Sequence, residues 1–209
     1  MATPITHIVL MDKIYEEQFG ICDKKDFLLG TLLPDIRYLD KSISRESTHS
    51  YDITLDAVKS ASTCFDKGML FHSLVDHVRD EFYISKGIYI RGGDEEFIIA
   101  LKLLEDQYLY NKIKNWDEYV SFLDIIPYEK MPDIKKEILD KRYAMIKQEL
   151  IDGPSDSVRK AFRAGLGIIG EYPDKINALI YTLQKDEKIL KLINEFYEFY
   201  ELFGSLIKK

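Results

Sequence analysis

Histidine and aspartate residues with the spacing of metal ligands lie in the first third of this chain. His72 and Asp76 are four residues apart in a segment with helical periodicity, so both side chains share one helix face and can reach one cation. His49 stands in a polar segment, and Asp35 directly follows Pro34. Zinc takes imidazole nitrogen and carboxylate oxygen, usually from three or four protein groups. These four side chains therefore predict a zinc site.

His7, near the start of the first expected helix, can join this site through a second ion bridged by Asp76. No histidine follows His77, so any site built from imidazoles is confined to the first 77 residues. His77 is rotated by about 100° from Asp76 around the helix and is interpreted as a structural residue. Asp80 lies one turn further along the same face and is a candidate extra ligand. For His7 alone, and for the pair His72 and Asp76 alone, an ordinary hydrogen-bonded role is the competing interpretation.

The composition indicates a folded protein without a dominant basic surface. Hydrophobic residues make up 46% and charged residues 31% of the 209 residues, with a net charge of -7. This charge argues against binding to a nucleic-acid duplex as the main activity. A small anionic substrate remains compatible, because a metal ion supplies local positive charge.

Cysteine usage and the N-terminus predict a cytoplasmic protein. Cys22 and Cys64 form no C-x-x-C motif and are expected to be buried thiols. The N-terminus lacks the basic region of a secretory signal. No stretch approaches the roughly 18 apolar residues of a transmembrane helix.

Hydrophobic periodicity and breaker residues predict a chain that is almost entirely α-helical. The expected helices span 4–19, 24–33, 66–87, 94–113, 116–126, 132–151, 154–167, 174–184 and 187–207. Asp66 is expected to cap the third of them, and residues 35–52 are expected to form a loop, which at this length is usually functional. The length suits one domain over 1–209, with a metal-site half (1–90) and a helical C-terminal half (91–209).

The aromatic run from Phe196 to Phe203 is interpreted as core or as the seam of a homodimer. A helix lying on a membrane surface would carry many lysines or arginines on its polar face, and only Lys208 and Lys209 follow the run.

Four sequence elements resemble the bacterial zinc-dependent phospholipase C family in their order and rough spacing. They are Pro4-Ile-Thr-His7, Phe27-Leu-Leu-Gly30-Thr-Leu-Leu-Pro34-Asp35-Ile36, Arg45-Glu-Ser-Thr-His49 and Gly68-x-x-x-His72-x-x-x-Asp76. The similarity covers residues 4–80, and the last element is fairly specific when combined with the upstream Pro-Asp and Thr-His pairs. The resemblance implies an all-α, multi-helix domain related to the fungal zinc-dependent single-strand nucleases. It also implies cleavage of phosphoester bonds at a cluster of up to three zinc ions.

The resemblance assigns a role to each candidate ligand. The residues that match the ligands of one family zinc are Asp35, His49, His72 and Asp76. His7 matches a ligand of another zinc, with Asp76 as the bridge. Family members also use the α-amino group of an N-terminal tryptophan, two downstream histidines and a glutamate, whereas this chain begins Met1-Ala2 and has no downstream histidine. The resemblance therefore implies a reduced set holding one or two ions, zinc or another divalent metal.

The implied function is a metal-dependent hydrolase acting on a small phosphoester or a phospholipid. Asp35 is the expected catalytic residue, doubling as ligand and proton acceptor. The alternative is a non-catalytic relative that keeps a structural metal and acts as an interaction protein through its C-terminal helices. An open coordination position separates the two, because a catalytic zinc keeps one and a structural zinc does not.

Overall fold

All the regular secondary structure in this computed structural model is helical, over the described residues 2–90, 93–156, 159–160 and 172–199. The α-helices are α1 (Pro4–Phe19), α2 (Lys24–Leu32), α3 (Leu55–Ser60), α4 (Cys64–Ser85), α5 (Glu95–Leu109), α6 (Trp116–Phe122), α7 (Lys136–Asp152), α9 (Tyr172–Leu183) and α10 (Glu187–Phe199). Short 3-10 helices are η1 (Pro34–Tyr38), η2 (Tyr110–Lys112) and η3 (Tyr128–Lys130). The expected all-α class is confirmed. Most of the helix expected over 154–167 lies outside the described residues.

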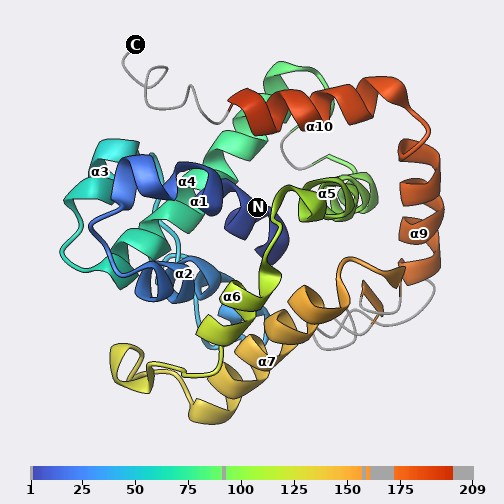
Figure 1. The fold of residues 1–209 in the computed structure, drawn as a ribbon. Helices are drawn as coiled ribbons and strands as arrows, with labels where there is room; N and C mark the ends of the chain where they lie inside the picture. Colours follow the sequence, from blue (N-terminus) through green and yellow to red (C-terminus); the bar gives the residue numbers. More distant parts are fainter. Residues whose placement is uncertain (1, 91–92, 157–158, 161–171, 200–209) are drawn as a thin grey trace.

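The helices form two groups in the view of Figure 1. The first group, α1 to α4, lies on one side, and α7, α9 and α10 surround α5 on the other. Buried hydrophobic residues from Ala2 to Phe196 form one connected cluster, so the described parts of both halves share a core. None of the described helices combines the length and the hydrophobicity needed to cross a membrane.

Helix α4 begins two residues earlier than expected. Its N-cap is Thr63, whose hydroxyl accepts a hydrogen bond from the Asp66 backbone N–H at 3.0 Å and donates to the Asp66 carboxylate at 2.7 Å. The expectation that Asp66 caps this helix was therefore wrong. Asp66 lies inside the first turn, three positions after the N-cap, where a negative charge is favourable.

Helices α2 and α4 cross with their backbones in contact. A methyl group added at Gly30 would overlap the carbonyl oxygen of Phe65, and one added at Gly68 would overlap that of Phe27. Only glycine permits this approach. It places His72, one turn beyond Gly68, directly over the end of α2.

Helix α7 closes the last turn of α2 from the other side. The final carbonyl groups of a helix have no partner within the helix. The Tyr143 hydroxyl donates to the carbonyl oxygen of Leu29 at 2.9 Å. The Arg142 guanidinium donates to that of Leu32 through Nε at 3.3 Å and Nη2 at 3.1 Å. Side chains more than 100 residues downstream thus hold the segment that leads into η1.

Helix α5 is tied to α4 and α1 by buried polar groups. Arg79 donates to both carboxylate oxygens of Glu105, at 2.7 and 2.9 Å, and both side chains are fully buried. Asp106 accepts hydrogen bonds from the backbone N–H and the hydroxyl of Thr6, at 3.2 and 3.0 Å. The α5 face that carries Lys102, Glu105 and Asp106 is therefore turned toward the start of α1 and the middle of α4.

Helix α10 packs on the core through its apolar face. Phe196 is fully buried, and the centroid of its ring lies 5.5 Å from that of Phe82 and 5.7 Å from that of Tyr83. Phe196, at the start of the aromatic run, is thus core, and the homodimer seam stays a prediction. Residues 200–203 of that run lie outside the described residues.

Candidate metal centre

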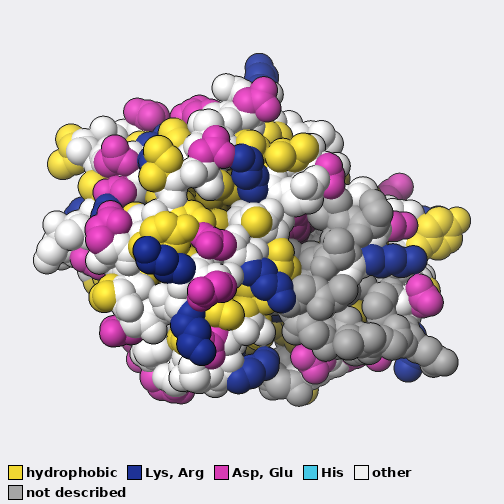
Figure 2. Space-filling view, turned by 90° about the horizontal axis from the view of Figure 1, so that it is seen from below, with side chains coloured by type: hydrophobic (Ala, Val, Ile, Leu, Met, Phe, Trp, Pro, Cys, Tyr) yellow, Lys and Arg dark blue, Asp and Glu magenta, His cyan; other side chains and the backbone are white. Residues whose placement is uncertain are grey.

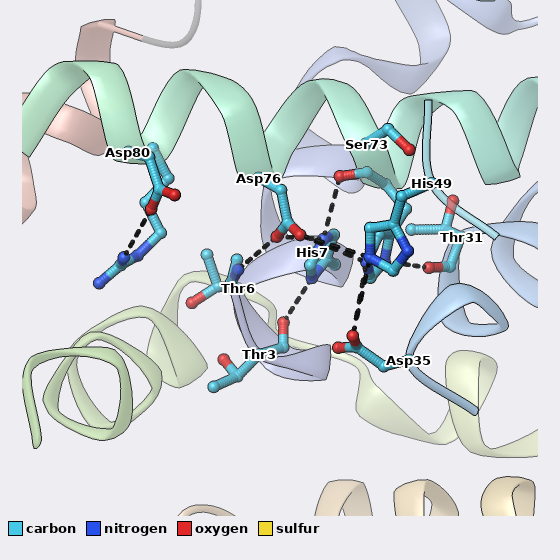
Figure 3. Close-up of polar contacts among 12 residues, drawn as sticks. Thr3, Thr6, His7, Thr31, Asp35, His49, Ser73, Asp76 and Asp80 are labelled. Atoms are coloured by element: carbon cyan, nitrogen blue, oxygen red, sulfur yellow. Dashed lines mark hydrogen bonds and ion pairs between the residues drawn. The ribbon is translucent and has the colours of Figure 1, made fainter. Parts of the chain in front are cut away.

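Five polar side chains from four parts of the chain meet in a buried cluster, and Figure 3 labels four of them: His7, Asp35, His49 and Asp76. Helix α1 supplies His7, η1 supplies Asp35, the loop after η1 supplies His49, and α4 supplies both His72 and Asp76. None of the five is more than 8% exposed. On the face shown in Figure 2, basic and acidic side chains are interspersed with hydrophobic ones, and no histidine is visible among the described residues. The structure brings together every member of the expected ligand set.

Four atoms of this cluster have the spacing of metal ligands. His49 Nε2 lies 3.8 Å from Asp35 Oδ1 and 3.7 Å from Asp76 Oδ2. His72 Nε2 lies 4.0 and 3.7 Å from the same two oxygens. These separations are too long for hydrogen bonds. Zinc ligands bound at about 2.0–2.2 Å stand about 3.3–3.6 Å apart in a tetrahedron, so each of these four separations is slightly longer than in a bound site. Two sets of three ligand atoms each lie within 4.8 Å of one another: Asp35, His49 and His72, and His7, His72 and Asp76.

Three of these atoms are buried without a hydrogen-bond partner among the described residues: Asp35 Oδ1, His49 Nε2 and His72 Nε2. Buried polar atoms are nearly always paired in native proteins, because an unpaired one loses the hydrogen bonds of water. Lone pairs that converge at ion-bonding distances are satisfied by a shared cation. The donor set therefore fits a divalent metal.

The other ring nitrogen of each histidine fixes the orientation of its imidazole. Nδ1 of His72 lies 2.9 Å from the Thr31 carbonyl oxygen, and Nδ1 of His7 lies 2.8 Å from that of Thr3. Nδ1 of His49 lies 2.9 Å from the Thr48 hydroxyl. A carbonyl oxygen accepts a hydrogen bond only from a protonated Nδ1, which leaves the Nε2 lone pair of His72 facing the carboxylates. Nε2 of His7 lies 3.4 Å from the His72 carbonyl oxygen as well as 3.6 Å from Asp76 Oδ1.

Asp76 faces two groups of ligands with its two oxygens. Its Oδ2 faces His49 and His72, whereas its Oδ1 lies 3.6 Å from His7 Nε2 and accepts a hydrogen bond from the Ala2 backbone N–H at 2.5 Å. The rings of His7 and His72 stack with centroids 4.0 Å apart. Asp76 therefore has the disposition of a carboxylate that bridges two ions.

Burial keeps the imidazoles neutral. It lowers the pKa of His49 to about 4 despite the nearby Asp35 and Asp76 carboxylates, and lowers that of His7. Burial and the neighbouring His7 lower the pKa of His72 to about 3. Neutral imidazole is the form that binds a metal, so no proton has to be removed from these rings near neutral pH.

The carboxylates are held in the ionised form. Burial alone would raise the pKa of Asp35, but His72 and the buried guanidinium of Arg142 outweigh it and lower the pKa. The pKa of Asp76 is likewise lowered, because electrostatic interactions with neighbouring groups and the hydrogen bond from the Ala2 backbone N–H outweigh burial. Two ionised carboxylates offset the charge of one divalent ion.

A cavity of about 400 Å³ reaches the cluster from the solvent side. His49 and Asp76 form part of its wall, together with Ser73 on α4. The remaining lining residues include Arg45, Tyr51, Asp52, His77, Asp80 and Glu81. His77 thus lines the cavity, away from the ligand atoms. Asp80 accepts a hydrogen bond from Tyr89 at 2.9 Å and pairs with Arg79 at 3.6 Å, outside the ligand set.

Two basic residues near the cluster were not found by sequence reasoning. Arg142, 2% exposed, lies close enough to Asp35 to lower its pKa. Lys102 on α5 is half-buried. Its pKa is lowered by burial and, to a smaller extent, by the charge of Arg79, which together outweigh the opposite effect of Asp76, Asp80 and Asp35. Neither residue has a distinguishing motif, and only the packing of α5 and α7 shows that they are close to the cluster.

Comparison with protein-family models, with curated proteins and with solved structures returns no match for this chain. The likeness to the zinc-dependent phospholipase C family therefore depends on the four sequence elements and their order alone.

Proposed function

We propose that this protein is a divalent-metal-dependent phosphoester hydrolase of the zinc-dependent phospholipase C type. The observation that carries the proposal is the convergence of Asp35, His49, His72 and Asp76 at 3.7–4.0 Å beside a solvent-connected cavity. A structural zinc is normally closed off by its four ligands. A cavity that reaches His49 and Asp76 gives a substrate direct access to the ligand shell.

One or two ions fit the residues present. Asp35, His49 and His72 form one group that could hold an ion, and His7, His72 and Asp76 form the other. Asp76 Oδ2 lies 3.7 Å from Nε2 of both His49 and His72, so Asp76 would complete the first ligand set, and its Oδ1 would join His7 at the second ion. A divalent ion at these positions supplies Lewis-acid chemistry, which neutralises charge on a phosphoryl oxygen and makes water a better nucleophile. The nitrogen and oxygen donors suit zinc best, although other first-row divalent metals accept them too.

The surrounding residues provide the other parts of a hydrolytic site. Asp35 is ionised and sits at the edge of the cluster, so it can accept a proton from an attacking water. Arg45 lines the cavity, and Lys102 lies near Asp76 and Asp80. These two basic side chains would supply positive charge for an anionic substrate. A phosphoester, whether a small molecule or a phospholipid headgroup, matches this combination of metal and basic side chains.

The alternative function is that of a non-catalytic relative with a structural metal. It is favoured by the fact that two histidines and two aspartates already complete a tetrahedral zinc site. The two functions differ in whether metal-loaded protein turns over a phosphoester.

The test combines elemental analysis with an activity assay on protein purified without a metal-affinity tag. We expect about one or two equivalents of metal per chain, and chelator-sensitive hydrolysis of a chromogenic phosphodiester or phosphomonoester. The His72→Ala variant should lose both metal and activity. Turnover that survives chelation and this substitution would come from elsewhere and would refute the proposal. Metal-loaded protein with no turnover on lipid, nucleotide and sugar phosphates would support the structural alternative.

A further inference from the structure

The two cysteines of the chain, 42 residues apart in sequence, lie side by side in the fold. The Asp23 backbone N–H donates a hydrogen bond to Cys64 Sγ at 3.2 Å. Because Asp23 N is only two covalent bonds from the Cys22 Cα, Cys64 Sγ lies within about 6 Å of that Cα. The two thiols are within interaction distance, and Cys64 is one of the groups that raise the pKa of Cys22. The pair thus joins the turn before α2 to the first residue of α4.

Both thiols are reachable from solvent. Each cysteine is partly exposed, which corrects the expectation that they are buried, and the adjoining Ile21 is fully exposed. Cys64 is the first residue of α4, and its Sγ accepts the hydrogen bond from the Asp23 backbone N–H. Burial and the neighbouring Cys64 thiol raise the pKa of Cys22 to about 11. Either thiol can make the first attack on an oxidant, because the disulfide that results is the same.

We propose that Cys22 and Cys64 form a reversible disulfide by exchange with a low-molecular-weight disulfide, at a site separate from the metal centre. One of the two cysteine thiolates attacks one sulfur of the small disulfide and expels one thiolate. The other cysteine then attacks the resulting mixed disulfide, forms the Cys22–Cys64 bond and expels the second small thiolate. Two thiol protons and two electrons leave the protein, and the small disulfide is reduced to two thiols.

The bond would close residues 22–64 into a loop that contains two of the five candidate ligands, Asp35 and His49. It would also fasten the start of α4 to the turn before α2. Helix α4 carries two further candidate ligands, His72 and Asp76. A cross-link of this length restricts the unfolded chain, so oxidation should raise the melting temperature by about 5–15 °C. This inference does not rest on the proposed hydrolase function.

The experiment oxidises the reduced wild-type protein with oxidised glutathione in the presence of a chelator. Intact mass is then measured after denaturation and alkylation. We expect a monomer lighter by two hydrogens that takes up no alkylating agent, and that regains two alkylatable thiols on reduction. The Cys22→Ser and Cys64→Ser variants serve as matched controls and should give only a glutathione adduct or a free thiol.

Three results would overturn the proposal: two thiols that stay alkylatable, stable glutathione adducts on the wild-type chain, and disulfide-linked dimers. Because the comparison uses two redox states of the wild-type chain, it does not depend on the folding of a variant. Metal content plays no part in the measurement, so this proposal and the proposed hydrolase function can fail separately.

Discussion

Replacing His49 by asparagine separates a metal-binding imidazole from an ordinary buried one. In the metal-free protein the His49 ring is neutral, and its Nε2 stands 3.7–3.8 Å from the carboxylates, too far for hydrogen bonds. The substitution therefore costs chiefly the Thr48 hydrogen bond and some packing, about 1–2 kcal/mol. That amounts to a fall of about 2–8 °C in melting temperature for a chain of this size.

The metal-bound protein should respond much more strongly. Zinc held at about 1,000 times its dissociation constant stabilises the folded state by about 4 kcal/mol. Loss of one ligand of four removes most of this term, so the variant should melt about 8–16 °C lower still. His49→Asn thus shows a small effect in chelator and a large one in zinc.

The assay is thermal melting of both proteins with chelator and with zinc, supported by calorimetric zinc titration. His77→Asn is the matched control, because His77 lies on α4 next to Asp76 but outside the ligand atoms. It should leave zinc binding unchanged. An equal loss of melting temperature in chelator and in zinc would show that His49 is a structural residue and would refute the reasoning from ligand geometry.

Five further substitutions, at four positions, make three tests of the surroundings of the site. Lys102→Gln should raise the KM for a phosphoester about tenfold and weaken inhibition by inorganic phosphate, whereas the control Lys102→Arg should change neither. Unchanged phosphate inhibition in both variants would show that Lys102 does not bind the substrate. Glu149, buried on α7, has its pKa raised to about 8 by burial and by Asp106, so the folded state holds its proton more tightly than the unfolded chain. The stabilisation from the protonated Glu149 carboxyl is present at low pH and is lost as the pH rises through about 8. The melting temperature of Glu149→Gln should therefore rise progressively above that of wild type between pH 5.5 and 9. A difference in melting temperature that does not change with pH would contradict this. Gly68→Ala places a methyl group on the Phe27 carbonyl oxygen and should cost about 3 kcal/mol or more in denaturant unfolding. Gly87→Ala, where the methyl group meets no atom within 4 Å but φ is +67°, should cost about 1 kcal/mol, and equal costs would contradict the close helix crossing.

Most helices, and the placing of His72 and Asp76 on one helix face, could be predicted because their signals are local. Apolar residues that recur every three or four positions mark most helices. His7, Asp35 and His49 were expected from their order in the chain and from the family resemblance. α3, with six residues, is too short to show a period and was not expected. The capping error at Asp66 had a similar origin, since Thr63 and Asp66 are both good cap residues and only the structure shows which one precedes the helix.

Contacts between distant segments could not be predicted from one sequence. Arg142 and Lys102 approach the cluster only because α7 and α5 pack against α2 and α4. Cys22 and Cys64 come together only because those two helices cross through glycines. Nothing local to these residues marks them as neighbours, and their spacing has no period that helix geometry would explain.

The hydrogen bonds from α7 to the end of α2 have a consequence for attempts to shorten the protein. All five candidate ligands occur before residue 77, which suggests that a peptide of the first 90 residues would suffice as a small metal-binding scaffold. Such a fragment would lack Tyr143 and Arg142, leaving the carbonyl oxygens of Leu29 and Leu32 without their donors just before Asp35. During synthesis, too, the ligands emerge from the ribosome long before the segment that secures them. We therefore expect the site to acquire its metal after translation is complete, and a transplanted N-terminal fragment to bind zinc poorly.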